Sequence, residues 1–341
     1  MPKTKEAVYG CILGHAVGDA LGEPVEFADR VPKEIPKLSP VNNHFTDDSQ
    51  MMVAIAEALL AVPPHKNSQE QFMAELSRQY VEWRRHPLGG SHRSPGAACL
   101  EGAANLHSGK LWHQSGGLTA KGNGSAMRSS VVGAFYHLDL NMAWRVGCLT
   151  AVPTHNNLEP ILCAGAVSLL CAACIAGLSW PKAVREVQMR IENWENSVPY
   201  YPKEVRLGSK FEDQNPWYTA AHFSIGYILG HSAREDRDLF DWNGNDFASV
   251  PATTAAIYFN TRYSTFRDVA VNCARWTMDS DTTAAIAGAI AGARFGVEGI
   301  PHTWRTDLEL SAHFHELAER VWEASLEVGR PPAPAARSGA A

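Results

Sequence analysis

Two segments of the sequence carry glycines four residues apart, and this spacing constrains the fold more than any other feature. Residues four apart share one face of an α-helix. Because glycine is a poor helix former, a stripe of it predicts that another helix backbone packs closely against that face. We therefore expect both helices to lie centrally in the fold. The glycines are Gly10, Gly14, Gly18 and Gly22 in the first segment, and Gly288, Gly292 and Gly296 in the second.

Much of the remaining chain also favours helices. Apolar residues recur at helical spacing, and no series of alternating strand segments separated by hairpin turns is present. We predict an all-α fold, an orthogonal helical bundle, in one domain over residues 5–328, followed by a disordered tail at 329–341 that is rich in proline and alanine. The expected helices are 5–22, 47–62, 68–84, 126–137, 158–177, 252–263, 266–277, 282–295 and 307–327.

Composition narrows the class of partner. The net charge of -6 gives no general attraction to nucleic acid or to anionic lipid, so we expect neither as a partner. Glycines, His15 and Asp19 interrupt the apolar N-terminal segment, which therefore does not look like a signal peptide. Seven scattered cysteines do not form a secreted disulfide framework. We expect a cytoplasmic protein whose partners are proteins or small molecules.

The apolar run at residues 161–178 reaches the length of a membrane span. It is rich in alanine, cysteine and glycine and lacks flanking basic anchors, so a buried central helix is the preferred interpretation. Cys171 and Cys174 form a CxxC pair inside this run, with no second pair that could complete a zinc site. We expect them to be core residues.

Two acidic clusters, each at the start of an expected helix, suggest a metal site. Thr46, Asp47 and Asp48 could simply cap a helix, since hydroxyls and first-turn acids satisfy free N–H groups and complement the helix dipole. Asp279, Asp281 and Thr282 begin a helix so rich in small residues that it must be buried. Buried carboxylates need a cation or a hydrogen-bond network, and hard cations such as Mg²⁺ or Mn²⁺ prefer oxygen ligands. Together the clusters predict one or two bound divalent cations.

Three further features could belong to the same site. Glu26 follows Pro24, which interrupts the first helix, so Glu26 could face a cleft or lie on the surface. Residues 116–124 form a glycine-rich loop before a helix, which could hold phosphate oxygens or be a plain turn. His155 precedes the long apolar helix and could contact a ligand phosphate or cap that helix. No HExxH motif is present, which argues against a zinc enzyme.

Taken in order, these segments resemble the ADP-ribosylglycohydrolase family, which includes the dinitrogenase reductase-activating glycohydrolases. The resemblance extends from Gly10 to about Pro301. It rests on GCILGHAVGDALGEPVEF, FTDDSQMMVAIAEALL, GNGSAMR, the pair Thr154 and His155, and DSDTTAAIAGAIAGARFG.

The resemblance implies an all-α bundle with a binuclear Mg²⁺ or Mn²⁺ centre that cleaves ADP-ribose from its acceptor. Glu26 would lie beside the metals, and Glu26, Asp47 and Asp281 would be the catalytic candidates. The implied metal ligands are Thr46, Asp47, Asp48, Asp279, Asp281 and Thr282. The implied ligand-binding residues are Gly122, Asn123, Gly124, Ser125, Met127, Arg128 and His155.

The function expected from this resemblance is metal-dependent removal of ADP-ribose from a modified protein side chain, with arginine as the preferred acceptor. One alternative is hydrolysis of a small ADP-ribose derivative or another N-glycoside. Another is a non-catalytic ADP-ribose-binding protein, such as an immunity protein that blocks a cognate ADP-ribosyltransferase toxin. The complete set of acidic residues favours an enzyme.

Overall fold

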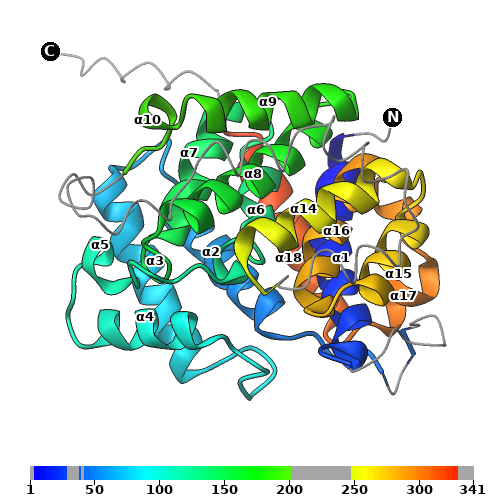
Figure 1. Ribbon diagram of the computed structural model, residues 1–341, viewed down its shortest axis with the longest axis horizontal. Helices are drawn as coiled ribbons and strands as arrows, with labels where there is room; N and C mark the ends of the chain where they lie inside the picture. The colour runs from blue at the N-terminus through cyan, green and yellow to red at the C-terminus, as the bar shows by residue number, and fades with distance from the viewer. Residues whose placement is uncertain (1–3, 29–37, 40–41, 201–246, 329–341) are drawn as a thin grey trace, which may run out of the picture.

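The structure is a computed structural model that describes residues 4–28, 38–39, 42–200 and 247–328. These residues form helices and isolated bridges without a β-strand, which confirms the predicted all-α class (Figure 1). The predicted disordered tail at 329–341 lies outside the described residues. The helices are α1 (Thr4–Gly22), η1 (Glu23–Val25), α2 (Asp47–Ala61), α3 (Gln69–Arg85), α4 (Ala97–His107), α5 (Trp112–Ser115), η2 (Asn123–Ser125), α6 (Ser130–Phe135), α7 (Leu140–Ala151), α8 (Leu158–Ile175), α9 (Trp180–Glu192), α10 (Trp194–Ser197), α14 (Ser249–Arg262), α15 (Phe266–Trp276), α16 (Ser280–Phe295), η4 (Val297–Gly299), α17 (His302–Asp307) and α18 (Ser311–Ser325).

The two glycine stripes pack against each other, so that α1 and α16 lie side by side (Figure 1). A Cβ atom at Gly10 would overlap the carbonyl oxygen of Gly292, and one at Gly14 would overlap that of Gly288. Farther along, Gly22 lies against the backbone of Ser280. This order makes the helices antiparallel. The C-terminal end of α1 therefore meets the N-terminal end of α16, which brings the acidic residues at these two ends together.

The apolar run at residues 161–178 forms most of α8, which is buried in the core. This helix is long and apolar enough to span a membrane, yet 94% of its 18 residues are buried within the protein. Cys171 and Cys174 are among its buried residues, and both are free thiols, as expected for core residues. Gly133 of α6 packs so closely on α8 that a Cβ atom there would overlap the carbonyl oxygen of Ser168.

Two predicted helices differ from those in the structure. The segment 126–137 contains a turn before the short α6, because the η2 turn occupies 123–125 and the regular helix begins only at Ser130. The segment 307–327 is divided between α17 and α18. The break falls at Leu310, which adopts a left-handed conformation with a φ of 54°. Leucine rarely adopts this conformation, so the residue type at position 310 does not predict a break in the helix.

Candidate metal and ligand site

Acidic side chains from three segments converge beside the contact between α1 and α16. A cavity of about 300 Å³ lies where the turn after α1 meets the N-termini of α2 and α16. It is lined on one side by Glu26, Asp47, Asp48, Asp279, Asp281 and Thr282, and on the other by Gly122, Asn123, Gly124, Met127 and His155. The structure therefore brings together most of the site residues that were predicted from the sequence.

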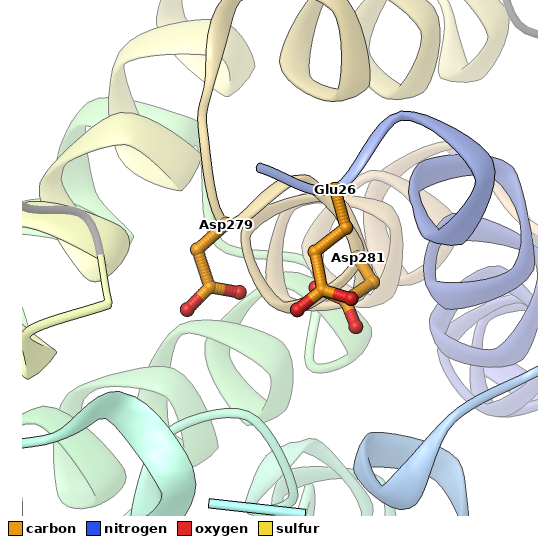
Figure 2. A group of neighbouring side chains, drawn as sticks. All are labelled: Glu26, Asp279 and Asp281. Atoms are coloured by element: carbon orange, nitrogen blue, oxygen red, sulfur yellow. The ribbon is translucent and has the colours of Figure 1, made fainter. Parts of the chain in front are cut away.

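Glu26, Asp279 and Asp281 form the closest group of potential ligands. Each offers a carboxylate oxygen, and these three oxygens lie within 4.8 Å of one another. Figure 2 shows the three carboxylates facing one shared space. Burial, followed by the charges of Asp279, Asp19 and Glu23, raises the pKa of Glu26 to about 7. Clustered carboxylates thus disfavour one another's ionisation when no cation lies between them.

Asp47 and Asp48 extend this group from the first turn of α2. Burial, and then the charges of neighbouring carboxylates, raises the pKa of both well above the ordinary value. Oδ2 of Asp47 and Oδ1 of Asp48 are buried and accept no hydrogen bond from any described residue. The hydroxyl of Thr282 donates to the other Asp48 oxygen, at 3.3 Å. Two oxygens are thus left without the partner that a buried acceptor needs.

This donor set fits hard divalent cations. Mg²⁺ and Mn²⁺ take carboxylate and hydroxyl oxygens, and a cation offsets the cost of burying several negative charges together. Helix capping alone would leave the buried oxygens of Asp47 and Asp48 uncompensated. Glu26, Asp47, Asp48, Asp279, Asp281 and Thr282 are the described residues that could hold such ions at the cavity.

Asp19 is the main residue of this region to which the sequence alone assigned no role. It is fully buried on α1, where it binds the residues that begin α2. Its carboxylate accepts hydrogen bonds from the backbone N–H of Thr46 at 2.9 Å and from the N–H and hydroxyl of Ser49 at 3.0 and 2.6 Å. Burial raises its pKa to about 6 despite these hydrogen bonds. Asp19 thus holds the N-terminus of α2 against α1. An acid inside an otherwise small and apolar helix was the available signal.

Thr46 is the N-cap of α2 and, unlike Asp47 and Asp48, is not among the residues that line the cavity. Its hydroxyl is 2.9 Å from Asp19 Oδ1 and 3.2 Å from Asp48 Oδ2, and it accepts from the Asp48 backbone N–H at 3.4 Å. The capping role considered from sequence is therefore present in the structure. It does not compete with a site, because the same turn presents Asp47 and Asp48 to the cavity.

The glycine loop at residues 122–124 is held at the cavity by contacts to the acidic cluster and to the segment that precedes α14. Asn123 donates from its side chain to Asp279 Oδ2 at 2.8 Å and from its backbone N–H to the Phe247 carbonyl at 2.9 Å. A Cβ atom at Gly124 would come within 2.9 Å of the His155 ring, so only glycine permits this close approach. The loop joins the acidic cluster to His155.

Two predicted ligand-binding residues point elsewhere. The Ser125 hydroxyl is buried and donates to the Pro160 carbonyl at 3.0 Å. The Arg128 side chain is also fully buried and bonds to Thr150 and Thr154 behind the cavity. The structure therefore does not bring either side chain into the cavity. The glycine loop turns at η2, where the Ser125 side chain faces the core, and beyond the turn Arg128 also faces the core whereas Met127 lines the cavity.

Two phenylalanines at the cavity were not nominated from the sequence. Phe27 and Phe247 both line it, with exposed fractions of 51% and 53%. Phe27 has a φ of 49°, and its N–H donates to the Met278 carbonyl at 2.7 Å. Large exposed aromatic side chains beside a cavity are suited to contacting a ligand. Their positions depend on loop conformation, which periodicity in the sequence does not reveal.

Comparisons with known proteins point to a single family. The family model described as ADP-ribosylglycohydrolase matches residues 1–331. The chain is similar to ADP-ribosylarginine hydrolase Tri1 of Pseudomonas putida, with 25% identity over 94% of this chain and 78% of that protein. It is also similar to ADP-ribosyl-[dinitrogen reductase] glycohydrolase of Rhodospirillum rubrum, with 25% identity over 91% and 92% of the two chains. A solved ADP-ribosylglycohydrolase-related protein complex shares the fold, with a TM-score of 0.68, 19% identity and coverage of 95% and 100%.

Proposed function

The chain belongs to the ADP-ribosylglycohydrolase family, and from this premise we propose that it uses divalent cations to release ADP-ribose from a modified protein side chain. One observation carries the proposal: carboxylates from three distant segments line one cavity together with a glycine loop and His155. The buried, unpartnered oxygens of Asp47 and Asp48 support the metal requirement. We propose two cations, Mg²⁺ or Mn²⁺, because the acidic side chains are too many for one small ion.

The chemistry required is hydrolysis of a glycosidic bond. Water adds its oxygen to the anomeric carbon, the bond to the acceptor breaks, and the acceptor takes a proton. Divalent cations bound at this site would supply positive charge that orients hydroxyl oxygens and makes a water more acidic. Glu26, Asp47 and Asp281, which line the cavity, would hold or move protons there. The loop at Gly122–Gly124 would orient the ribose and diphosphate.

We propose arginine as the acceptor. Tri1 carries arginine in its name, and Phe27 and Phe247 offer aromatic faces beside an acidic cavity. A guanidinium stacks on aromatic rings and is attracted by nearby carboxylates, whereas a serine hydroxyl gains neither contact. The alternative substrates are a small ADP-ribose derivative or another N-glycoside. A protein that only binds ADP-ribose and blocks a toxin would need no complete set of carboxylates.

A panel of linkages tests the acceptor. We expect the metal-loaded protein to release ADP-ribose from ADP-ribosyl-arginine with a kcat/KM at least about tenfold higher than from ADP-ribosyl-serine or from small ADP-ribose derivatives. The reason is that only the guanidinium gains one cation–π contact and one contact with a charged carboxylate. Released ADP-ribose would be quantified by chromatography. A preference for serine would contradict the arginine assignment but not hydrolysis. Protection against a toxin without any release would favour the blocking role.

A further inference from the structure

Behind the cavity lies a buried cation whose described partners are all uncharged. The Arg128 guanidinium donates to the Thr150 carbonyl at 3.0 Å and to the Thr154 hydroxyl oxygen at 2.6 Å, and it lies over the Tyr80 ring. Its other contacts are the sulfur atoms of Met51 and Cys99. Burying such a charge is costly, which suggests that Arg128 has a task beyond packing.

The hydroxyl of Thr154 links this cation to His155. Its oxygen lies 2.8 Å from Nδ1 of His155 and 3.4 Å from the Ala151 carbonyl oxygen. Arginine has only donors, so the Thr154 oxygen must accept from Arg128. The hydroxyl hydrogen then points either to His155 or to Ala151.

The Ala151 carbonyl already has its full complement of donors. It accepts from the backbone N–H of Thr154 at 3.1 Å and from that of His155 at 2.8 Å. A carbonyl oxygen has two lone pairs, so a third donor at 3.4 Å would gain little. The hydroxyl hydrogen of Thr154 is therefore directed to Nδ1 of His155, at the shorter distance.

We propose that Arg128 and Thr154 are positioning residues that hold His155 in the tautomer with its proton on Nε2, so that the ring donates a hydrogen bond into the cavity. An imidazole whose Nδ1 accepts must carry its proton on Nε2 when neutral. Nε2 borders the glycine loop, 3.4 Å from where a Cβ atom would lie at Gly122 or Gly124. No described residue bonds to Nε2, which leaves it for a ligand.

The charge state of His155 agrees with this role. Burial, and then the charge of Arg128, lowers the pKa of His155 to about 3. The ring is therefore neutral at ordinary pH and is a poor general base. The Nε2–H group of this neutral ring would bind best to an acceptor oxygen that carries negative charge. ADP-ribose has such oxygens in its diphosphate, so this part of the inference rests on the proposed function. The buried Arg128 adds positive charge behind the same contact.

Nuclear magnetic resonance of the full-length, Mg²⁺-loaded protein labelled with ¹⁵N-histidine tests the tautomer directly. Its His155 signals would be assigned by their loss in His155→Gln. We expect the wild-type ring to carry its proton on Nε2, and Thr154→Ser, which keeps the hydroxyl, to do the same. Thr154→Val removes the hydroxyl with little change in shape, so the proton is expected to redistribute toward Nδ1. The affinity for ADP-ribose should then fall about tenfold, as for loss of one hydrogen bond to a charged group.

Thr150→Val is the matched control. Thr150 is equally buried, its hydroxyl donates to the Gly147 carbonyl within α7, and it meets Arg128 only through its backbone carbonyl. This variant should change neither the tautomer nor the affinity. A wild-type ring protonated on Nδ1 would overturn the inference, and so would a Thr154→Val protein that keeps the wild-type tautomer. If the tautomer is as expected but ADP-ribose does not bind, the inference stands and the proposed function fails.

Discussion

Asp47→Asn is expected to remove nearly all turnover and, at the same time, to make the metal-free protein more stable. Asp47 is buried among other carboxylates, and its Oδ2 accepts no hydrogen bond from a described residue. Asparagine keeps the shape and removes one uncompensated charge, so the Tm in chelator should rise by a few degrees. Losing a proposed ligand should lower kcat/KM by at least about 100-fold. Mutating a residue that only hydrogen-bonds to a metal ligand already lowers metal affinity or activity by about 10–100-fold.

Thermal unfolding with and without Mg²⁺ or Mn²⁺ measures both effects. The wild-type Tm should rise on metal addition, because a ligand that binds only the folded state stabilises it, and the rise should be much smaller in Asp47→Asn. Asp268→Asn is the matched control, since Asp268 is also a first-turn acid, at the start of α15, but is only partly buried. If Asp47→Asn instead lowered the Tm in chelator and kept its activity, Asp47 would be only a helix-capping acid.

Gly292→Ala is expected to destabilise the protein by about 3 kcal/mol or more, the upper range for overpacking a core. Helix propensity alone predicts the opposite sign, a gain of about 1 kcal/mol. The difference arises because the new methyl group would overlap the carbonyl group of Gly10, and a backbone cannot move aside as a side chain can. Forcing α1 away from α16 would also separate Asp19 and Glu26 from Asp279 and Asp281, so metal affinity should fall.

Denaturant unfolding measures the change in stability, and titration of the stripped protein with Mn²⁺ measures the affinity. Gly96→Ala is a suitable stability control, because its φ is -61° and no atom lies within 4 Å of the added Cβ position. We expect it to change stability by less than about 1 kcal/mol. Equal effects of the two substitutions would show that the close contact between α1 and α16 is not essential.

The sequence predicted the central helices because their signals are local. Glycines four apart and acids at helix starts can be read without knowing the fold, and α1, α2 and α16 were expected within two residues of their observed ends. The close backbone contact was also expected. That the two stripes contact each other was not, because one glycine face does not identify its partner.

Several helices were missed although some of their start signals were available. Asp139 caps α7 by accepting from the N–H groups of Asn141 and Met142, and Ser179 followed by Pro181 begins α9. In α9 the buried Val184, Val187 and Ile191 also recur at helical spacing, so the sequence carried both kinds of signal for this helix. α4 begins at Gly96 without a side-chain cap, so its start carried no such signal.

The candidate site was predictable by residue type but not by side-chain direction. Asp47 and Asp281 line the cavity as expected, whereas Arg128 points into the core from the same short segment as Met127, which does line it. Adjacent residues in a tight turn face different sides, and only the three-dimensional path of the chain decides which side is the cavity. The link from Arg128 through Thr154 to His155 depends on that path too.

The most direct test of metal-dependent ADP-ribosyl hydrolysis is release of ADP-ribose from an ADP-ribosyl-arginine substrate by the full-length protein. The protein would be stripped with chelator, assayed, and assayed again after Mg²⁺ or Mn²⁺ is added. We predict that release falls to the level without enzyme in chelator, returns with either or both metals, and does not return in Asp47→Asn. Undiminished release in chelator, or no release with either metal, would contradict this function.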